Sequence, residues 1–520
     1  MGVEAATRHL RGTEWSLIGW RRRDARAVVA APSPIHEVCP LANWIKSEGI
    51  YNALPIPLQN ACVAWRGWRI YRERFGREHD ALMELFEAFE HASPEEHRAY
   101  QETRLRKLIH HAYETVPYYR RVMDERGLRP SDIRSAADLR KLPVITKDDV
   151  RQAGDTLVSS TVNPDRLRVA WTSATSSSPL PVRWDRAVAL VNHASYMRVR
   201  RWAGVPFGRP YASMQGKPVV PISQKRPPFW RHNPLWNQVL FSAIALSNES
   251  LPHYVKKMRR SKVEMLETYP SCAYVMARFL EDRGEHLPLT CLLTTGEPLL
   301  PDERAVIEER FQAPVFDAYG QAERVVFSSE CEKHEGHHVY PEYGLTELLD
   351  GDGNEVSAGE FGSVVGTGLH NFAMPLIRYA CGDVASHSDK ACSCGRTLPM
   401  FGGLTSREAD ILVAPDGRMV PPIMVGWIVK ILEGVTNWQV IQESTTELHV
   451  LVVREQPVTE EEMEGVKGYV SRRLSPEVNV RVDLVDEIPR GRRGKSRHVV
   501  SRVPLVWGVP NRSPGIDGDA

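Results

Sequence analysis

Hydrophobic residues in the first third of the chain follow the spacing of an amphipathic helix. Four of them recur at i, i+3, i+4 and i+7, which predicts one apolar helical face: Leu105, Leu108, Ile109 and Ala112. The segment Ser93–Glu96 predicts the start of this helix, because it combines a capping serine, a first-turn proline and a glutamate three positions after the serine. Pro117 predicts its end, since a residue before proline avoids the helical conformation.

Further along, short β-type runs alternate with helical runs. Residues 292–295 form a strand pattern that reaches a turn at Gly296, and a helical pattern follows at 301–311. A second strand pattern covers 315–320. This alternation, which extends from about residue 165 to residue 405, predicts an α/β protein with helices layered on a sheet.

The pattern changes after residue 407. Strand patterns at 448–453 and 480–485 flank a helix that Thr459 caps, which predicts a small α+β domain. At roughly 100–200 residues per domain, the length of 520 residues predicts two to four domains. We expect four parts: a poorly ordered tail at 1–48, a large N-terminal domain at 49–407, a small C-terminal domain at 408–507 and a disordered tail at 508–520.

Charge and hydropathy exclude several classes of protein. Lys plus Arg number 66 and Asp plus Glu number 65, and this balance argues against nucleic acid or an anionic membrane as the main partner. The longest apolar run, at 239–246, is far too short to span a bilayer, and the first residues show no signal-peptide pattern. Eight cysteines in 520 residues are too thinly spread for a disulfide scaffold. We therefore expect a cytoplasmic protein with a substantial core.

Residues 172–178 form the most unusual local sequence, because every position except Ala174 carries a hydroxyl. A loop of small residues lets backbone N–H groups and hydroxyls converge on an anion such as phosphate. The candidates for such contacts are Thr172, Ser173, Thr175 and Ser176. Taken alone, the segment fits a solvated polar loop better.

Three further clusters place a glycine next to an acid beside a predicted strand: Gly296–Glu297, Tyr319–Glu323 and Arg378–Asp383. Glycine permits close backbone approach, and an acid can hold a metal ion or a ribose hydroxyl. Lys495 follows Gly494 in the small domain and is a point charge suited to a developing negative charge. Taken singly, each glycine–acid cluster fits an ordinary turn better.

In this order and spacing, the motifs resemble the adenylate-forming enzymes and, more narrowly, the phenylacetate–CoA ligase family. The resemblance covers about residues 50 to 505. It rests on the segments 113–119 (YETVPYY), 142–147 (LPVITK), 295–297 (TGE), 319–323 (YGQAE), 375–379 (PLIRY), 382–383 (GD) and 392–397 (CSCGRT). Two upstream segments are similar to the CapK branch, which is found with capsular polysaccharide genes: 54–60 (LPIPLQN) and 71–76 (YRERFG).

The resemblance implies a large multi-layer domain that binds ATP and the acid, and a small mobile lid domain that rotates about Asp410. It implies that loop 172–178 closes over the ATP phosphates, that Glu323 holds Mg²⁺, and that Lys495 bridges the acid carboxylate and the α-phosphate. The other implied nucleotide contacts are Gly296 and Glu297 at the edge of adenine, Tyr319 near adenine with Gly320 and Gln321 in the same motif, Asp383 on the ribose, and Arg407 supporting Asp383.

The chain also departs from the family pattern. Ala174 and Ser177 stand where the family has glycine, and Ser178 stands where it has lysine. Each lost glycine removes access to positive φ, and the lost lysine removes a charge on phosphate. Other departures are Ala322 for threonine, Cys381 for threonine and Ser406 for glycine. These changes leave two interpretations open, an active enzyme with a weakened phosphate grip and a degenerate, non-catalytic homologue.

Four residues predict a metal site apart from the nucleotide. Cys331 and His338 lie seven positions apart, and Cys392 and Cys394 flank one serine ahead of a glycine. Cys₃His from two ligand pairs suits a closed, structural, tetrahedral Zn²⁺ site. Some members of the resembled family have equivalent residues. Rival ligands are His334, His337 and Cys381, and reduced cysteines beside a His-rich loop are the alternative.

The leading hypothesis is an ATP-dependent acid ligase that adenylates a carboxylic acid, by preference an aryl acid, and transfers the acyl group to CoA or another acceptor in polysaccharide biosynthesis. Its expected cofactors are ATP, Mg²⁺, CoA and structural Zn²⁺, and whether it forms a homodimer stays open. Aromatic residues at 195–245 could bound an aryl acid, although such side chains more often form a core. The competing hypotheses are a catalytically degenerate scaffold or binding protein and a zinc-organised interaction protein.

Overall fold

The computed structural model describes residues 48–163, 167–171, 180–215, 219–221, 224, 226–243, 246, 250–405, 412–415, 419–420, 431–432, 435, 437–488 and 498–503. Several predicted features lie outside these residues: the hydroxyl-rich loop 172–178, Arg407, Asp410, Lys495 and nearly all of both predicted tails. The described strands β1 (Arg168–Trp171) and β2 (Pro181–Trp184), which precede and follow this loop in the sequence, pair antiparallel.

α-Helices run through the described part of the chain, and some of them begin at a side-chain N-cap. They are α2 (Glu48–Ala53), α3 (Ile56–Arg74), α4 (Arg77–Phe89), α5 (Pro94–Thr115), α6 (Pro117–Glu125), α7 (Lys147–Ala153), α8 (Arg186–Trp202), α9 (Leu251–Arg260), α10 (Pro270–Glu281), α11 (Pro301–Phe311) and α13 (Glu460–Arg473). At the start of α5, the Ser93 hydroxyl accepts from the Glu96 N–H at 3.2 Å and the Glu96 carboxylate accepts from the Ser93 N–H at 2.8 Å. The predicted capping box and the predicted end before Pro117 are both confirmed.

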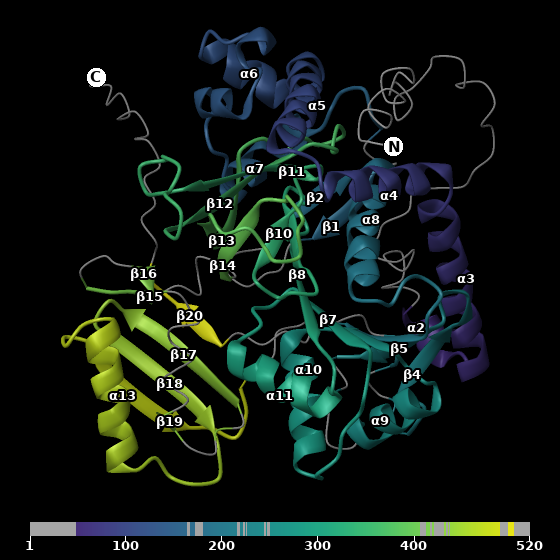
Figure 1. Cartoon of the computed structure of the whole chain (residues 1–520), viewed down its shortest axis with the longest axis vertical. Coiled ribbons are helices and arrows are strands. Elements are labelled where there is room, and N and C mark those ends of the chain that lie inside the picture. Colours follow the sequence, from purple (N-terminus) through teal and green to yellow (C-terminus); the bar gives the residue numbers. More distant parts are fainter. Residues whose placement is uncertain are drawn as a thin grey trace.

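A single twelve-stranded sheet runs through the large part of the molecule, in the order β11-β12-β13-β14-β10-β9-β8-β7-β6-β3-β5-β4 (Figure 1). Its strands are β3 (Tyr211–Gln215), β4 (Trp230–Asn233), β5 (Gln238–Ser242), β6 (Met265–Thr268), β7 (Cys291–Thr295), β8 (Val315–Gly320), β9 (Phe327–Glu330), β10 (His337–Val339), β11 (Gly344–Leu349), β12 (Phe361–Gly368), β13 (Tyr379–Ser388) and β14 (Met400–Thr405). β3 and β5 to β8 form a parallel section, and antiparallel strands extend it on both sides. The α/β fold class is thereby confirmed.

Side chains alternate between the two faces of the parallel section, so each face has a core of its own. On β7, Leu292 packs into a cluster with α9, α10 and α11, whereas Cys291 and Leu293 face a cluster with α4 and α8. β8 repeats the alternation, with Val315 on the first side and Phe316 on the second. The parallel section is therefore covered by helices on both faces, as parallel sheets require.

A second sheet belongs to the C-terminal part of the chain. It has the order β19-β18-β17-β20, formed by β17 (Asn437–Ser444), β18 (Glu447–Val453), β19 (Asn479–Leu484) and β20 (Val499–Ser501). α13 packs on it through Val466 and Val470, and Thr459 caps that helix as predicted. Two short pairs complete the strands, β1 (Arg168–Trp171) with β2 (Pro181–Trp184) and β15 (Leu412–Val413) with β16 (Met419–Val420). Among the described residues, no helix is both long and apolar enough to cross a membrane.

Candidate functional site

The first part of the candidate site lies where β7 and β8 end. These strands run parallel with Thr295 opposite Ala318, so Gly296 and Tyr319 follow at neighbouring points of the same sheet edge. Gly296 has a φ of +81°, which only glycine adopts readily, and it turns the chain toward the half-buried Glu297. Ligands of open α/β sheets bind at the carboxyl ends of parallel strands, so this edge suits a nucleotide.

Tyr319 and Asp383 come from distant strands and meet in a direct hydrogen bond. The Tyr319 hydroxyl donates to Asp383 Oδ2 at 2.7 Å, and Gln321 Nε2 donates to the same hydroxyl at 2.6 Å. Both residues are buried. Burial, followed by the charge of Asp383, raises the pKa of Tyr319 well above its ordinary value, so the phenol stays a neutral donor. This fixes the Asp383 carboxylate as an acceptor for further hydroxyl donors.

Glu323 is a second buried carboxylate that accepts a hydrogen bond from a tyrosine. Its Oε1 accepts from the Tyr379 hydroxyl at 2.7 Å. Burial raises the pKa of Glu323 and the charge of Asp383 adds to this increase. The bond from Tyr379, a backbone hydrogen bond and the charge of Lys147 only partly offset it. A cation beside Glu323 would relieve both the burial and the repulsion from Asp383. The carboxylate therefore fits the predicted Mg²⁺ contact in its chemistry.

A β-bulge explains how Tyr379 and Asp383 reach the same site from one strand. The register between β12 and β13 shifts between Ser363 and Val365, opposite residues 380–384 of β13. Gly382 lies inside this irregular stretch with a φ of +74°. Bulges re-aim side chains and are common next to active sites. The structure thus explains the predicted Gly382–Asp383 motif: Gly382 allows the backbone to turn within the bulge, and the turn directs the Asp383 side chain.

Two motifs quoted for the resemblance hold β13 in place rather than contributing to the polar group. Ile145 N–H donates to the Arg378 carbonyl at 2.9 Å, and Ala380 N–H donates to the Ile145 carbonyl at 2.9 Å. The buried Arg378 side chain donates to Glu347 at 2.8 Å through Nη2, and to the Leu142 carbonyl through Nη1. Sequence reasoning missed Tyr379, whose only signal was its place at the end of the 375–379 motif.

The small domain meets the large one through His498, which sequence reasoning also missed. His498 Nε2 lies 3.3 Å from the Glu303 carboxylate of α11, and Nδ1 lies 3.1 Å from the Trp438 carbonyl. The Trp438 ring contacts the imidazole in a tilted arrangement with the ring centres 4.6 Å apart, and Leu300 packs against the small domain's core. Burial alone would lower the pKa of His498, but the bond and charge of Glu303 and the charge of Glu297 raise it.

We expect this interdomain contact to weaken as the pH rises. Glu303 favours the protonated imidazole, so the contact is complete below the ordinary histidine pKa, about 6.5, and is lost as the pH passes the raised value. Small-angle scattering of the wild type at a series of pH values from about 6 to about 9 should show the two domains separating as the pH rises. The transition should vanish in His498→Gln and persist in His449→Gln, whose imidazole pairs with Asp483 inside the small domain. An unchanged transition in His498→Gln would contradict the assignment.

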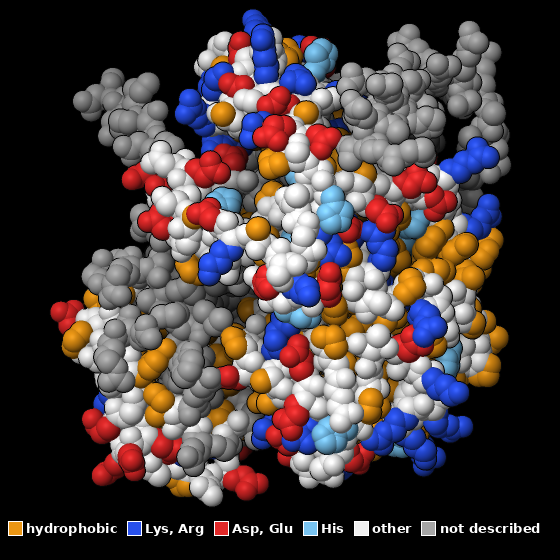
Figure 2. Space-filling view, in the orientation of Figure 1, with side chains coloured by type: hydrophobic (Ala, Val, Ile, Leu, Met, Phe, Trp, Pro, Cys, Tyr) orange, Lys and Arg blue, Asp and Glu red, His pale blue; other side chains and the backbone are white. Residues whose placement is uncertain are grey.

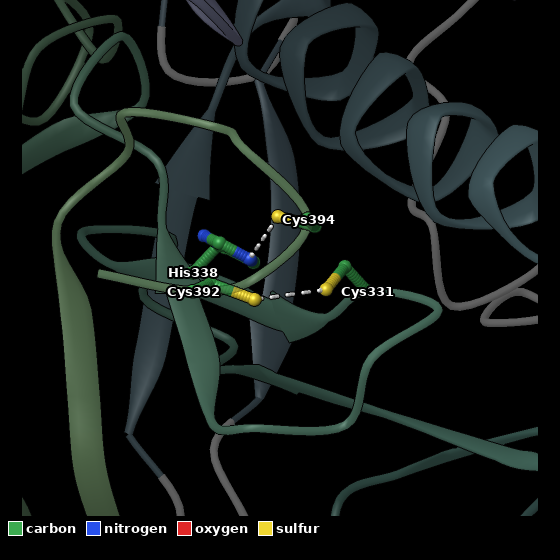
Figure 3. Close-up of side chains that lie close together, drawn as sticks. All are labelled: Cys331, His338, Cys392 and Cys394. Atoms are coloured by element: carbon green, nitrogen blue, oxygen red, sulfur yellow. Dashed lines mark hydrogen bonds between the residues drawn. The ribbon is translucent and has the colours of Figure 1, made fainter. Parts of the chain in front are cut away.

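The predicted metal ligands form a compact cluster (Figure 3). Cys331 Sγ lies 3.6 Å from Cys392 Sγ, Cys394 Sγ lies 3.5 Å from His338 Nε2, and all four ligand atoms lie within 4.8 Å of one another. Tetrahedral Zn²⁺ with the usual bond lengths separates two sulfurs by about 3.8 Å, and a sulfur from a nitrogen by about 3.6 Å. The two measured separations fit this geometry, and the cysteines are free rather than disulfide-bonded.

The rival ligands lie elsewhere. His334 Nδ1 pairs with Glu330 at 3.2 Å, His337 Nε2 lies 3.4 Å from Asp317, and the Cys381 thiol contacts the Tyr379 carbonyl at 3.7 Å. Backbone N–H groups point instead at the cluster's sulfurs, from Lys333 to Cys331 and from Arg396 to Cys394, both at 3.4 Å. Such bonds stabilise thiolates, whereas burial alone raises the pKa of the Cys331 thiol.

Arg396 ties the cysteine turn to the helices behind it. Its guanidinium donates to both oxygens of Glu332 at 2.9 Å and to Glu90 Oε2, just after α4, at 3.1 Å. It also lies 4.4 Å from the Trp202 ring of α8, which contacts the His338 ring at 5.7 Å. The cysteine turn is therefore connected to α4 and α8 through Arg396. These contacts suit a cluster that stabilises the fold.

The aromatic residues considered for an acid pocket are mostly core. Among them, five are buried: Trp202, Tyr211, Phe229, Trp236 and Phe241. Their side chains belong to the two clusters that flank the parallel section of the large sheet. They therefore give no support to an aryl substrate.

Comparisons with known proteins show which proteins the chain is similar to. A sequence model of the CapK C-terminal domain matches residues 412–502. The chain is 26% identical over 432 residues to a phenylacetate-coenzyme A ligase of Thermus thermophilus, covering 78% of this chain and 96% of the relative. It is 24% identical over 464 residues to protein CapK of Staphylococcus aureus, covering 87% of this chain and 99% of that one.

The fold is similar to a solved structure of 2-hydroxyisobutyryl-CoA ligase in the post-adenylation state in complex with an acyl-AMP. The TM-score is 0.62 at 21% identity, covering 79% of this chain and 91% of the other. An open conformation of that ligase, in complex with 2-HIB-AMP and CoA, gives a TM-score of 0.54. The fold is thus that of the adenylate-forming ligases, as the resemblance implied. Within that class, the sequence similarities confirm the resemblance to the phenylacetate–CoA ligase family and to CapK.

Proposed function

We propose that this protein is an ATP-dependent acid ligase, which adenylates a carboxylic acid and transfers the acyl group to CoA or another acceptor. The observation that carries the proposal is the buried polar group formed by Tyr319, Asp383, Glu323 and Tyr379, assembled from β8, its following turn and β13. Burying two carboxylates lowers the stability of the folded protein, even though each accepts a hydrogen bond from a tyrosine. Binding of a nucleotide with its cation would explain why both are present.

Each part of this group suits one part of ATP. Asp383 accepts a hydrogen bond from the Tyr319 hydroxyl, and ribose hydroxyls are fitting further donors to its carboxylate oxygens. Gly296 and Glu297, followed along the sheet edge by Gly320 and Gln321, border the adjacent space for adenine. Bound Mg²⁺ would offset negative charge on the phosphates, and Glu323 is the residue that would hold it. Thr172, Ser173, Thr175 and Ser176 would supply the remaining phosphate donors, and Arg407 would support Asp383.

The chemistry follows from this arrangement. A carboxylate oxygen of the acid attacks the α-phosphorus of ATP, a new P–O bond forms, and the bond to the departing pyrophosphate breaks. Two anions approach each other in this step, so Lys495 would lower the repulsion by contacting both the carboxylate and the α-phosphate. In the second step an acceptor thiol, amine or hydroxyl attacks the acyl carbon, its proton is lost, and AMP leaves.

The Cys₃His cluster has a different role in this proposal. We infer that Cys331, His338, Cys392 and Cys394 hold a structural Zn²⁺. Four protein ligands at tetrahedral spacing leave no open position for a substrate, which separates this centre from the reaction. Its attachment through Arg396 to Glu90 and Trp202 supports a role in the stability of the large domain.

Pyrophosphate release from Mg²⁺–ATP tests the proposal directly. We expect one member of a panel of aryl and alkyl acids to stimulate release in the absence of an acceptor. Lys495→Ala should lower that release by about a hundredfold or more, because one charge on the developing transition state is removed. Lys467→Ala, on the exposed face of α13, is the matched control and should leave the rate unchanged.

The result also separates the two interpretations of the altered phosphate loop. If no acid stimulates pyrophosphate release and ATP does not bind, the changes at Ala174, Ser177 and Ser178 have disabled the phosphate loop, and the degenerate homologue replaces the ligase proposal. Repeating the active reaction with CoA, amines and sugar precursors then identifies the acceptor. Preference for an aryl acid and a place in polysaccharide biosynthesis are the finer parts of the proposal that this panel tests.

A further inference from the structure

One face of α3 is turned outward although the helix is firmly attached along its other face. The Gly67 carbonyl accepts from Trp236 Nε1 at 2.8 Å, and Asn60 Oδ1 accepts from the His232 N–H at 3.0 Å. Gly67 lies so close to Asn233 that a Cβ there would be 2.2 Å from the Asn233 amide oxygen. These contacts fix the rotation of α3 about its axis, so its outward residues are set by the fold.

The outward face is an apolar stripe, named here the α3 stripe. It consists of residues at i, i+3, i+7 and i+10, all of them exposed: Leu58, Ala61, Trp65 and Trp68. At about 100° per residue these positions share about 80° of the helix circumference. Leu58 is 51%, Trp65 54% and Trp68 45% exposed. Figure 2 shows hydrophobic side chains gathered along the right-hand edge of the molecule, where Figure 1 places α3, with Lys and Arg side chains above and below them.

The charge around the stripe has one sign. From Leu54 to Arg72 the chain carries three arginines and no acid. The Arg69 guanidinium lies 4.9 Å from the centre of the Trp65 ring, and that of Arg72 lies 5.1 Å from the Trp68 ring. Each pair places a cation over an indole ring, and the combination of exposed indoles with arginines is the side-chain chemistry of a membrane–water interface.

Two considerations decide which partner fits the α3 stripe better, a second copy of this chain or a lipid surface. A second copy of this chain would bring one row of arginines against another with no acid between them, which like-charge repulsion disfavours. An anionic lipid surface offers apolar chains for the indoles and phosphates for the arginines together. The net charge of +1 for the whole chain does not oppose such contact, because acids elsewhere balance this local excess.

We propose that the α3 stripe docks on the surface of an anionic lipid bilayer. α3 lies in the plane of the interface, with Trp65 and Trp68 at the level of the headgroups and with Arg69 and Arg72 on lipid phosphates. The contact is peripheral and reversible, because a single amphipathic face buries limited apolar area.

Co-sedimentation of the full chain with vesicles tests the proposal. We expect binding to vesicles of equal parts phosphatidylglycerol and phosphatidylcholine, weakened by salt, and much weaker binding to phosphatidylcholine alone. Arg69→Gln with Arg72→Gln should weaken binding by about thirtyfold, because each cation near the surface contributes about 1 kcal/mol. Trp65→Gln with Trp68→Gln should weaken it by about tenfold or more, since the buried apolar area is lost.

The matched control changes an exposed cation and an exposed apolar residue of the small domain. Arg481→Gln with Leu484→Gln should bind vesicles like the wild type, and thermal unfolding should show that all variants fold. Wild-type protein that stays in the supernatant, or a tryptophan double variant that binds as well as the wild type, would overturn the proposal. A concentration-dependent dimer that the tryptophan variant abolishes, without vesicle binding, would assign the stripe to a second copy instead.

Discussion

Replacing Glu323 with glutamine should lower acid-dependent pyrophosphate release by about a thousandfold, because a contact worth several kcal/mol to the charged transition state is removed. Glutamine keeps the size of the side chain and can still accept from the Tyr379 hydroxyl. The charge alone is therefore lost. Single-turnover measurement of pyrophosphate release at saturating ATP and acid separates this effect from weaker substrate binding.

The stability of the same variant should move the other way or stay constant. Burial and the charge of Asp383 both disfavour the Glu323 carboxylate in the protein without ligand, and the neutral amide removes that penalty. We expect the thermal midpoint of Glu323→Gln to equal or exceed that of the wild type. Tyr379→Phe is the companion variant, since it removes only the hydrogen bond. A variant that is destabilised and retains full activity would show that Glu323 serves the fold instead of the reaction.

The sequence allowed the local structure to be predicted where the cause is local. Ser93 and Glu96 form the α5 capping box within four consecutive residues, and Thr459 caps α13 in the same way. β7 and β8 are largely buried, and their short β-type runs that end at a glycine turn predicted both strands. In these elements, neighbours in sequence supply the interactions that decide the conformation.

The polar contacts of the site depend on tertiary placement and could not be derived in this way. Glu323 and Tyr379 lie 56 positions apart, and their meeting depends on the bulge before Asp383. The contact of His498 with Glu303 joins the small domain to α11 of the large domain, so it depends on how the two parts pack together. The metal ligands were the exception, because cysteine spacing limits the possible partners even before the fold is known. The sequence favoured His338 over the rivals His334 and His337, and strand β10 places His338 with the three cysteines.

The two proposed centres place different demands on the same domain. The buried polar group contains two carboxylates, Glu323 and Asp383, and the charge of Asp383 disfavours the charged form of Glu323. The cysteine cluster sits at the junction of α4, α8 and the β10 region, where Arg396 joins Glu90 to Glu332. A rigid brace at this junction can offset the stability that the polar group costs, as functional sites commonly require. Metal loss should therefore affect folding first and activity only as a consequence.

Purified protein should contain about one zinc per chain, and Cys392→Ser should contain almost none. Cys392 supplies one corner of the tetrahedron, and a serine hydroxyl is a poor substitute for a thiolate. The free energy of unfolding should fall by about 3 kcal/mol or more, because the binding free energy of a structural zinc is folding free energy. Elemental analysis and denaturant unfolding with and without a chelator measure the two effects.

Two matched variants distinguish this site from its rivals. Cys381→Ser and His337→Gln should keep their zinc, since Cys381 contacts the Tyr379 carbonyl and His337 faces Asp317, away from the cluster. His338→Gln should lose it together with Cys392→Ser. Equal zinc content in all four variants would mean that the metal binds elsewhere, and equal stability with and without chelator would remove the structural role. Loss confined to the cluster variants, accompanied by unfolding at lower denaturant, would place the brace at the junction of α4 and α8.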